Sequence, residues 1–339
     1  MASRVRYIGL PRNFPHWKSA EFEGPGREPG TNYGAGARPP VYIKTIEKIA
    51  ENMKHLLITF AMISFSASHS MAQEPIDQFT KKDTMNRIER SKETYEKLFK
   101  QIQSVSGSDD PELMTILQRF IFGEIFYIGN LSDTTRELIT ITALATNQTL
   151  PQLRAHTNTA LNIGVKPIEI REVIYQLAPF IGYPKVLNAL ETINTVFKDR
   201  KIKLPLQNEA TITDNERFDK GKEIQSPIYG EGMKQNMTDL PGEFADAIPR
   251  ILTESCFGDF YTRSGLDLKT RELMIFCALV TLGGADRQLG SHAVGNMKVG
   301  NDKETLLSAL VQLYPYIGFP RIANAIYAIK DAKVEADVH

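Results

Sequence analysis

The clearest hydrophobic pattern in the chain lies between Pro167 and Ile181. Apolar side chains recur there at intervals of three and four residues, at Ile170, Val173, Ile174, Leu177, Ala178 and Ile181. This spacing places them on one face of an α-helix. The same series returns 136 positions later, at Leu306, Ala309, Leu310, Leu313, Tyr314 and Ile317. The sequence therefore predicts an amphipathic helix that occurs twice.

Further helices are predicted on either side of this one. Pro111 suits the first turn of a helix, and Ser132 or Asp133 can cap another. Gly164 occupies the usual place just past a helix end. In the first half of the chain the predicted helices cover Asp83–Ile102, about Glu112–Ile128, Thr134–Thr146, about Leu150–Asn162, Pro167 to Ile181, and Pro184 to about Phe197.

The chain carries this helical plan twice. One copy runs from Arg136 to Pro184 and the other from Arg271 to Pro320, and both contain Arg-Glu-Leu, Gln-Leu-x-x-His and Ile-Gly-aromatic-Pro. A nearly fixed offset over such a span indicates a duplication. Since no run of alternating β-branched residues competes, we predict an all-α fold of two tandem units packed face to face. The first unit covers 83–199, a polar linker 200–216, and the second unit 217–332.

The N-terminal part does not fit this plan. Residues 1–52 are rich in Gly and Pro between 24 and 40 and have little apolar periodicity, so we expect disorder or a mis-assigned upstream extension. Residues 53–72 combine a basic start, a short apolar run and a small-x-small site, which predicts a signal peptide cleaved near Ala72. The alternative is an N-terminal anchor helix. We expect an exported, periplasmic protein without a stable membrane span, which N-terminal sequencing would check.

Composition excludes several classes of function. The chain has 40 basic and 40 acidic residues and no basic cluster with interleaved aromatic residues, so nothing predicts nucleic-acid binding. Its two cysteines, Cys256 and Cys277, form no C-x-x-C or Cys/His metal spacing, and we predict no metal site. Cys277 lies on an apolar helix and is expected to be an inert buried thiol.

The repeated motifs resemble the carboxymuconolactone decarboxylase family, which includes the alkylhydroperoxidase D-like proteins. The resemblance rests on Phe-Gly-Glu at 122–124, Gly-x-x-Ser-x-x-x-Arg-Glu-Leu at 129–138, Leu-Pro-Gln-Leu-Arg-Ala-His at 150–156, and Ile-Gly-Tyr-Pro at 181–184. It implies alkylhydroperoxidase D-like helical units that assemble as homo-oligomers, here a trimer-like ring of tandem units. It also implies sites at helix interfaces.

The peroxidase branch of that family uses a C-x-x-C motif with an upstream glutamate and a following histidine. This chain keeps the glutamate and histidine as Glu137 and His156, but Thr149 and Gln152 occupy the cysteine positions. In the second unit the positions fall on Ala285 or Gly284 and on Gln288. Reduction of peroxide by that mechanism needs a thiolate and a resolving thiol, so the dithiol chemistry is excluded.

Several polar residues are candidates for a site. His156 and His292 suit proton transfer near neutrality, although each could instead be a core histidine with one hydrogen bond. Glu137 and Glu272 could orient these histidines or could stabilise a helix N-terminus. Candidates for substrate binding are Arg154, which has no counterpart at Gly290, and the matched acids Glu124 and Asp259. Arg136 and Arg271 are expected to form surface or inter-unit ion pairs more readily than to bind a carboxylate.

The resulting hypothesis is a lyase without a cofactor that acts on a small carboxylated lactone or a related enolisable acid. The unsaturated carbonyl of such a substrate accepts the electrons as carbon dioxide leaves, so the protein must stabilise an enolate and return a proton. His156 would be the acid/base and Glu137 its orienting partner, with Glu272 and His292 as a supporting or duplicate site. Two alternatives are a peroxidase-like antioxidant, which the missing cysteines disfavour, and a non-enzymatic exported binding module.

Overall fold

The first unit consists of short helices close to the predicted positions. The computed structural model describes residues 86–333, and all regular elements in that range are helical, which confirms the all-α class with two tandem units. The elements of the first unit are α2 (Arg87–Phe99), α3 (Pro111–Gly123), the 3-10 turn η2 (Ile125–Tyr127), α4 (Asp133–Asn147), α5 (Leu150–Asn162), α6 (Pro167–Tyr175), α7 (Ala178–Ile181) and α8 (Tyr183–Asp199).

The second unit repeats this plan with some variation. Its elements are η3 (Asp214–Glu216), α9 (Arg217–Tyr229), α10 (Gly232–Gln235), α11 (Phe244–Leu252), the π-helix η4 (Thr253–Tyr261), α12 (Leu268–Leu282), α13 (Asp286–Lys298), α14 (Lys303–Ile317) and α15 (Phe319–Asp331). The linker carries no helix between Asp199 and Asp214. It is fixed against the loop before α12, because the Glu209 carbonyl accepts a hydrogen bond from the Ser264 amide at 3.0 Å.

Three predicted helices of the first unit were wrong in extent. The helix expected to reach Ile102 ends at Phe99, because Lys100 adopts a left-handed conformation. The helix expected to reach Ile128 ends at Gly123, because the guanidinium of Arg136 takes the carbonyls of Ile125 and Ile128 at 3.2 and 2.8 Å. The helix expected to reach Ile181 breaks into α6 and α7 just before Pro179, which has no N–H to donate, whereas α14 carries Pro315 at the matching position and continues to Ile317.

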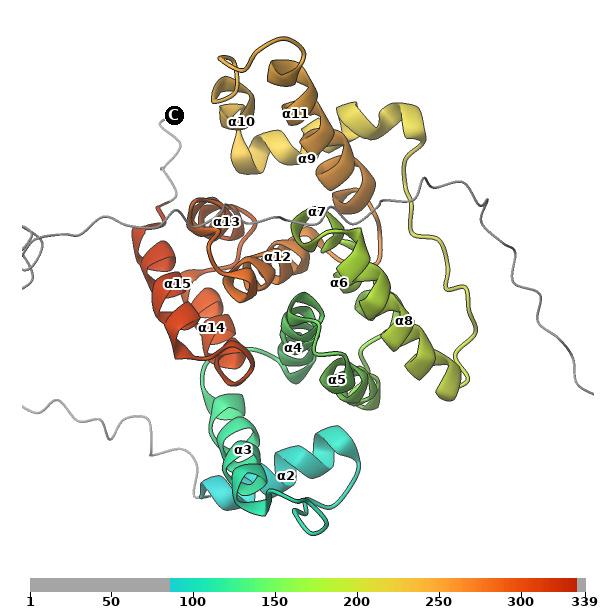
Figure 1. Cartoon of the computed structure of the whole chain (residues 1–339), viewed down its shortest axis with the longest axis vertical. Coiled ribbons are helices and arrows are strands. Elements are labelled where there is room, and N and C mark those ends of the chain that lie inside the picture. The colour runs from blue at the N-terminus through green and yellow to red at the C-terminus, as the bar shows by residue number, and fades with distance from the viewer. Residues whose placement is uncertain (1–85, 334–339) are drawn as a thin grey trace, which may run out of the picture. The chain divides into compact units, whose positions relative to one another are not determined.

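The centre of the fold is the contact between α4 and α12, one helix from each unit (Figure 1). Residues 136–146 of α4 and 271–281 of α12 are all buried, so both helices are covered on every side rather than along a single stripe. Thr142 bonds the carbonyl of Leu138 and reaches the sulfur of Met274 in the other unit at 3.4 Å. A single hydrophobic core therefore contains residues of both units.

Glycine allows a close helix crossing in each unit. A Cβ on Gly258 would lie 2.4 Å from the backbone carbonyl oxygen of Arg217, and one on Gly123 would lie 2.1 Å from that of Arg87. Since the obstructing atoms are backbone, neither crossing can accept a side chain without moving a helix.

We expect Gly258→Ala to lower the free energy of unfolding by about 1–3 kcal/mol, the usual cost of overpacking. Gly290→Ala is the matched control, because no atom lies within 4 Å of the added Cβ and alanine favours a helix. Urea denaturation of both variants measures the difference. Equal stability of the two variants would contradict the tight crossing.

The predicted signal peptide at 53–72 and the segment 1–52 lie outside the described residues, so both stay predictions. Between residues 86 and 333, no helix combines the length and apolar character that crossing a membrane requires.

Candidate functional site

The first candidate site is the pair formed by Glu137 on α4 and His156 on α5, called the first pair below. Nδ1 of His156 lies 2.8 Å from Oε2 of Glu137. Glu137 is fully buried and His156 is 7% exposed. When Nδ1 carries the proton that the carboxylate accepts, the lone pair of the imidazole is on Nε2. The geometry therefore orients one ring nitrogen and leaves the other for chemistry.

This contact decides between the two interpretations of Glu137. The side chain that caps α4 is Ser132, whose oxygen accepts a hydrogen bond from the Thr135 amide at 3.1 Å. Glu137 lies one turn further along the helix and binds His156 instead. A role at the helix N-terminus is therefore wrong for Glu137.

The second pair, Glu272 on α12 and His292 on α13, has the same geometry with additional partners. Nδ1 of His292 lies 3.1 Å from Oε2 of Glu272. The hydroxyl of Tyr229 donates to the same oxygen at 2.6 Å and lies 2.7 Å from Nδ1. The hydroxyl of Tyr261 donates to the other carboxylate oxygen at 2.7 Å. Burial and the negative charge of Glu272 raise the pKa of both tyrosines, which keeps them protonated as donors.

An aromatic ring from the opposite unit covers each histidine. Tyr316 at the end of α14 lies edge-on to His156, with ring centroids 5.6 Å apart. Phe180 on α7 lies in the same way against His292, also at 5.6 Å. Each pair is therefore completed by the other unit, so both sites lie at the contact between the two units.

The first pair lacks the tyrosines of the second. Phe99 and Phe126 stand at the positions that correspond to Tyr229 and Tyr261, and the Phe99 ring lies 6.1 Å from that of His156. Within residues 86–333, Oε1 of Glu137 is buried without a hydrogen-bond partner, and so is the hydroxyl of Tyr316. The two sites thus share one plan and differ in their hydrogen bonding.

The three predicted substrate-binding residues are engaged elsewhere. Arg154 forms an exposed ion pair with Asp199 at 2.6 Å. Glu124 pairs with Arg87 and ties α3 to α2. Asp259 accepts two bonds of 2.6 Å from Arg217 and ties the π-helix to α9. The structure brings none of them into hydrogen-bond contact with either pair, so their predicted role gains no support.

Two buried arginines join the units. Arg136 donates to Gln312 of the second unit at 3.1 Å, and Arg271 donates to Gln176 of the first unit at 3.3 Å. Burial lowers the pKa of both guanidinium groups, although nearby carboxylates oppose this effect. The predicted inter-unit ion pair is confirmed for Arg271, which lies 3.5 Å from Glu172 of the first unit. Arg136 crosses the contact through the neutral Gln312 instead, and the surface location is wrong for both arginines.

The cysteines do not provide a reactive thiol. Cys256 and Cys277 are both free and buried, and burial raises the pKa of each thiol. The prediction of a buried Cys277 is confirmed. Thr149, which stands in one of the relatives' cysteine positions, bonds the Leu144 carbonyl at 3.3 Å.

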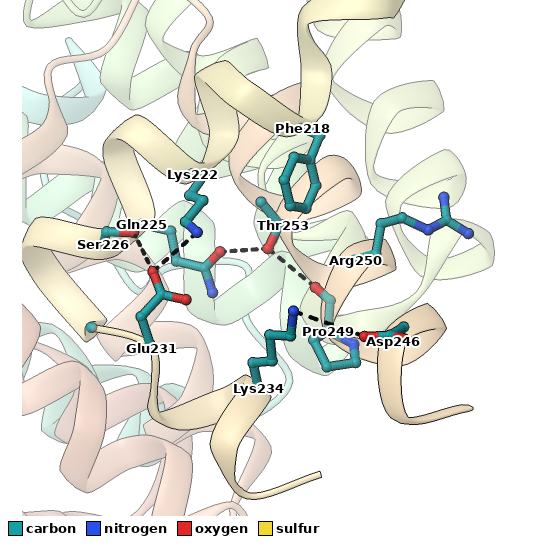
Figure 2. A pocket seen from close by; sticks show the side chains of 11 residues that line it. Phe218, Lys222, Gln225, Ser226, Glu231, Lys234, Asp246, Pro249, Arg250 and Thr253 are labelled. Carbon is teal, nitrogen blue, oxygen red and sulfur yellow. Dashed lines mark hydrogen bonds and ion pairs between the residues drawn. The ribbon is translucent and has the colours of Figure 1, made fainter. Parts of the chain in front are cut away.

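A separate hollow lies between α9, α10 and α11 and contains neither pair (Figure 2). Its charged groups are largely paired with each other: Lys222 with Glu231 at 3.3 Å, and Lys234 with Asp246 at 3.8 Å. Thr253 donates to Gln225 at 2.6 Å. We assign no chemistry to this hollow.

Sequence reasoning missed Tyr229, Tyr261 and Tyr316. The available signal was a change of chemistry between the two copies, from Phe99 to Tyr229, from Phe126 to Tyr261, and from Phe180 to Tyr316. These substitutions keep the ring and add a hydroxyl. The three changes fall at offsets of 130, 135 and 136, so only a comparison that allows the offset to vary marks all three positions.

Fold and site define an all-α protein of two tandem units, each with a buried histidine–carboxylate pair at the contact between the units. The chain belongs to the carboxymuconolactone decarboxylase family, whose sequence model matches residues 111–194 and again 246–331.

Two known proteins are similar to this chain in sequence, at low identity. A 4-carboxymuconolactone decarboxylase of Acinetobacter baylyi is 31% identical over 88 residues, which are 26% of this chain and 66% of that protein. An uncharacterized 15.0 kDa protein in the nqo9–nqo10 intergenic region of Paracoccus denitrificans is 38% identical over 80 residues, 23% of this chain and 60% of that protein. The matched stretches thus span less than two thirds of both relatives.

Proposed function

We propose that the protein is a lyase that needs no cofactor and removes carbon dioxide from a small carboxylated lactone or a related enolisable acid. The observation that carries the proposal is the buried contact of 2.8 Å between Nδ1 of His156 and Oε2 of Glu137. A carboxylate on Nδ1 fixes the tautomer and the orientation of the ring, so Nε2 is the nitrogen that can hold and release a proton. The family and the name of the Acinetobacter relative support the class of reaction.

The reaction has two steps. The bond between the substrate carbon and its carboxylate breaks, carbon dioxide leaves, and the electron pair moves through the double bond to the carbonyl oxygen. The resulting enolate then takes a proton at carbon from Nε2 of His156, and water restores the imidazolium. Glu137 touches the histidine and acts by positioning it. The low exposure of His156 limits access of water to the enolate.

Turnover in heavy water tests this proposal. With 4-carboxymuconolactone as the first substrate, we expect one carbon dioxide for each product and one deuterium on the carbon that receives the proton, as measured by NMR. No turnover of this lactone or of a panel of related acids would refute the lyase. Binding without turnover, detected by thermal shift, would favour a non-enzymatic binding module.

The proposal includes an exported homo-oligomer. N-terminal sequencing of the mature protein and light scattering of the purified chain would check these two properties.

A further inference from the structure

We propose that the two pairs have different roles. The first pair, together with Tyr316 of the second unit, binds the part of a small ligand that carries a hydroxyl or enol beside a carbonyl oxygen. The second pair is closed by its own tyrosines and binds none. The inference rests on the proposed function for the class of ligand. An enolised substrate offers both an enol oxygen and a carbonyl oxygen.

The carboxylate of Glu137 has one unused acceptor. Oε2 bonds His156, whereas Oε1 is buried without a hydrogen-bond partner among the described residues. A buried oxygen that has lost water and gained no donor is costly, so such an atom indicates a donor from outside the chain. The hydroxyl or enol of a ligand can supply it.

The hydroxyl of Tyr316 is a second unused group at the same site. It is buried and without a partner among the described residues, and its ring lies against that of His156. Burial and the charge of Glu137 raise its pKa. The nearby Thr140 hydroxyl opposes the rise, but it donates to the Arg136 carbonyl at 2.9 Å and makes no hydrogen bond of acceptable geometry with Tyr316, so the phenol stays protonated. It is therefore a donor suited to a carbonyl or enolate oxygen. Asn147 of the first unit helps to hold this turn, because its side-chain amide donates to the Tyr316 carbonyl at 3.4 Å.

The second pair shows what a filled site looks like. Both oxygens of Glu272 accept hydrogen bonds, one from Tyr261 at 2.7 Å and the other from Tyr229 at 2.6 Å, with His292 at 3.1 Å. Phe180 stands where the first site has Tyr316, so no free phenol faces His292. The tyrosine hydroxyls occupy the acceptors that a ligand would need.

One added hydroxyl group should be enough to block the first site. Phe126 corresponds to Tyr261, since each lies six positions before the residue that caps the next helix, Ser132 or Asp267. In Phe126→Tyr the new hydroxyl is expected to donate to Oε1 of Glu137, as Tyr261 does to Glu272. Phe180→Tyr makes the same change of side chain at the second site and is the matched control.

The experiment measures binding of α-hydroxy-γ-butyrolactone by ligand-observed NMR and calorimetry. This neutral lactone has a hydroxyl beside a carbonyl and no carboxylate to lose. We expect one site per chain, binding at least about ten-fold weaker in Phe126→Tyr, and unchanged binding in Phe180→Tyr. Tyr316→Phe should bind about five-fold more weakly, as expected for the loss of one neutral hydrogen bond. A melting temperature of Phe126→Tyr at or above that of the wild type excludes misfolding.

The outcomes separate the two proposals. Two sites per chain, no binding by the wild type at millimolar lactone, or wild-type affinity in Phe126→Tyr would each overturn the inference. Oε1 of Glu137 would then face a buried water molecule or no polar group. If the lactone binds as expected but no acid is decarboxylated, the inference stands and the lyase fails. If Phe126→Tyr decarboxylates its substrate at the wild-type rate, the lyase stands and the inference fails.

Discussion

Replacing His156 with alanine is expected to lower the rate of decarboxylation by about 10²–10⁴-fold, the usual contribution of a general acid or base. The loss should fall on kcat, because the imidazole of His156 is required when the enolate takes its proton. Measurement of carbon dioxide release at saturating substrate gives the effect directly. The far-ultraviolet circular dichroism should be unchanged, since the α5 backbone does not depend on this side chain.

His292→Ala is the matched control for this prediction. The two histidines occupy the same place in the repeat and are similarly buried, at 7% and 9% exposure, so truncation costs each site comparable packing. We expect turnover in His292→Ala to stay within the same order of magnitude as in the wild type. Equal losses in both variants would show that the two pairs act together or only support the fold.

Glu172→Gln is expected to reduce the free energy of unfolding by about 3–5 kcal/mol, the cost of leaving buried charge uncompensated. Glu172 is fully buried on α6 and accepts bonds from Arg263 of the second unit at 2.8 and 2.9 Å and from Arg171 at 3.0 Å. Arg271 of the second unit lies 3.5 Å away. Loss of the carboxylate leaves several guanidinium groups close together without a counter-charge.

The same variant changes how stability depends on pH. Burial opposes ionisation of Glu172, but the bonds and charges of Arg263, Arg271 and Arg171 outweigh it and hold the carboxyl pKa below its usual value of 4.5. A group whose pKa is lower in the folded state stabilises the protein above its unfolded pKa. This stability is lost as pH falls through the folded pKa. The denaturation midpoint of the wild type should therefore fall more steeply below about pH 4.5 than that of Glu172→Gln.

Urea titrations at a series of pH values test both parts of this prediction. Glu191→Gln, an exposed change on α8, is the control and should alter the free energy of unfolding by no more than about 0.5 kcal/mol. Parallel pH curves for the wild type and Glu172→Gln would contradict the assigned role of the arginine cluster.

The fold could be predicted because the helical pattern is local and occurs twice. The bounds of α5 match the predicted Leu150–Asn162, since Pro151 and Gly164 mark the two ends within the sequence itself. The end of α3 could not be predicted. It depends on where the Arg136 guanidinium takes its carbonyl partners, and this is decided only after α4 has packed.

The candidate site was predicted in part for the same reason. Glu137 and His156 lie on adjacent helices, and the spacing of the pair nearly recurs in the second unit, so the sequence could propose the contact. Tyr316 is 160 positions from His156 and reaches it only because the two units pack together. Tyr229 corresponds to Phe99 at an offset of 130 rather than 136, so comparison at a single offset does not align them.

The reciprocal contacts of Arg136 with Gln312 and of Arg271 with Gln176 relate the two halves by an approximate two-fold operation. In a symmetric dimer of single units, one substitution in the gene would change both copies of a site together. In this chain the two halves are separate stretches of one polypeptide, joined by residues 200–213. A single substitution can therefore change one site and leave the other unchanged. The second half carries the hydroxyls of Tyr229 and Tyr261 on its carboxylate. The first half has phenylalanine at both positions, and one oxygen of its carboxylate has no hydrogen-bond partner among the described residues.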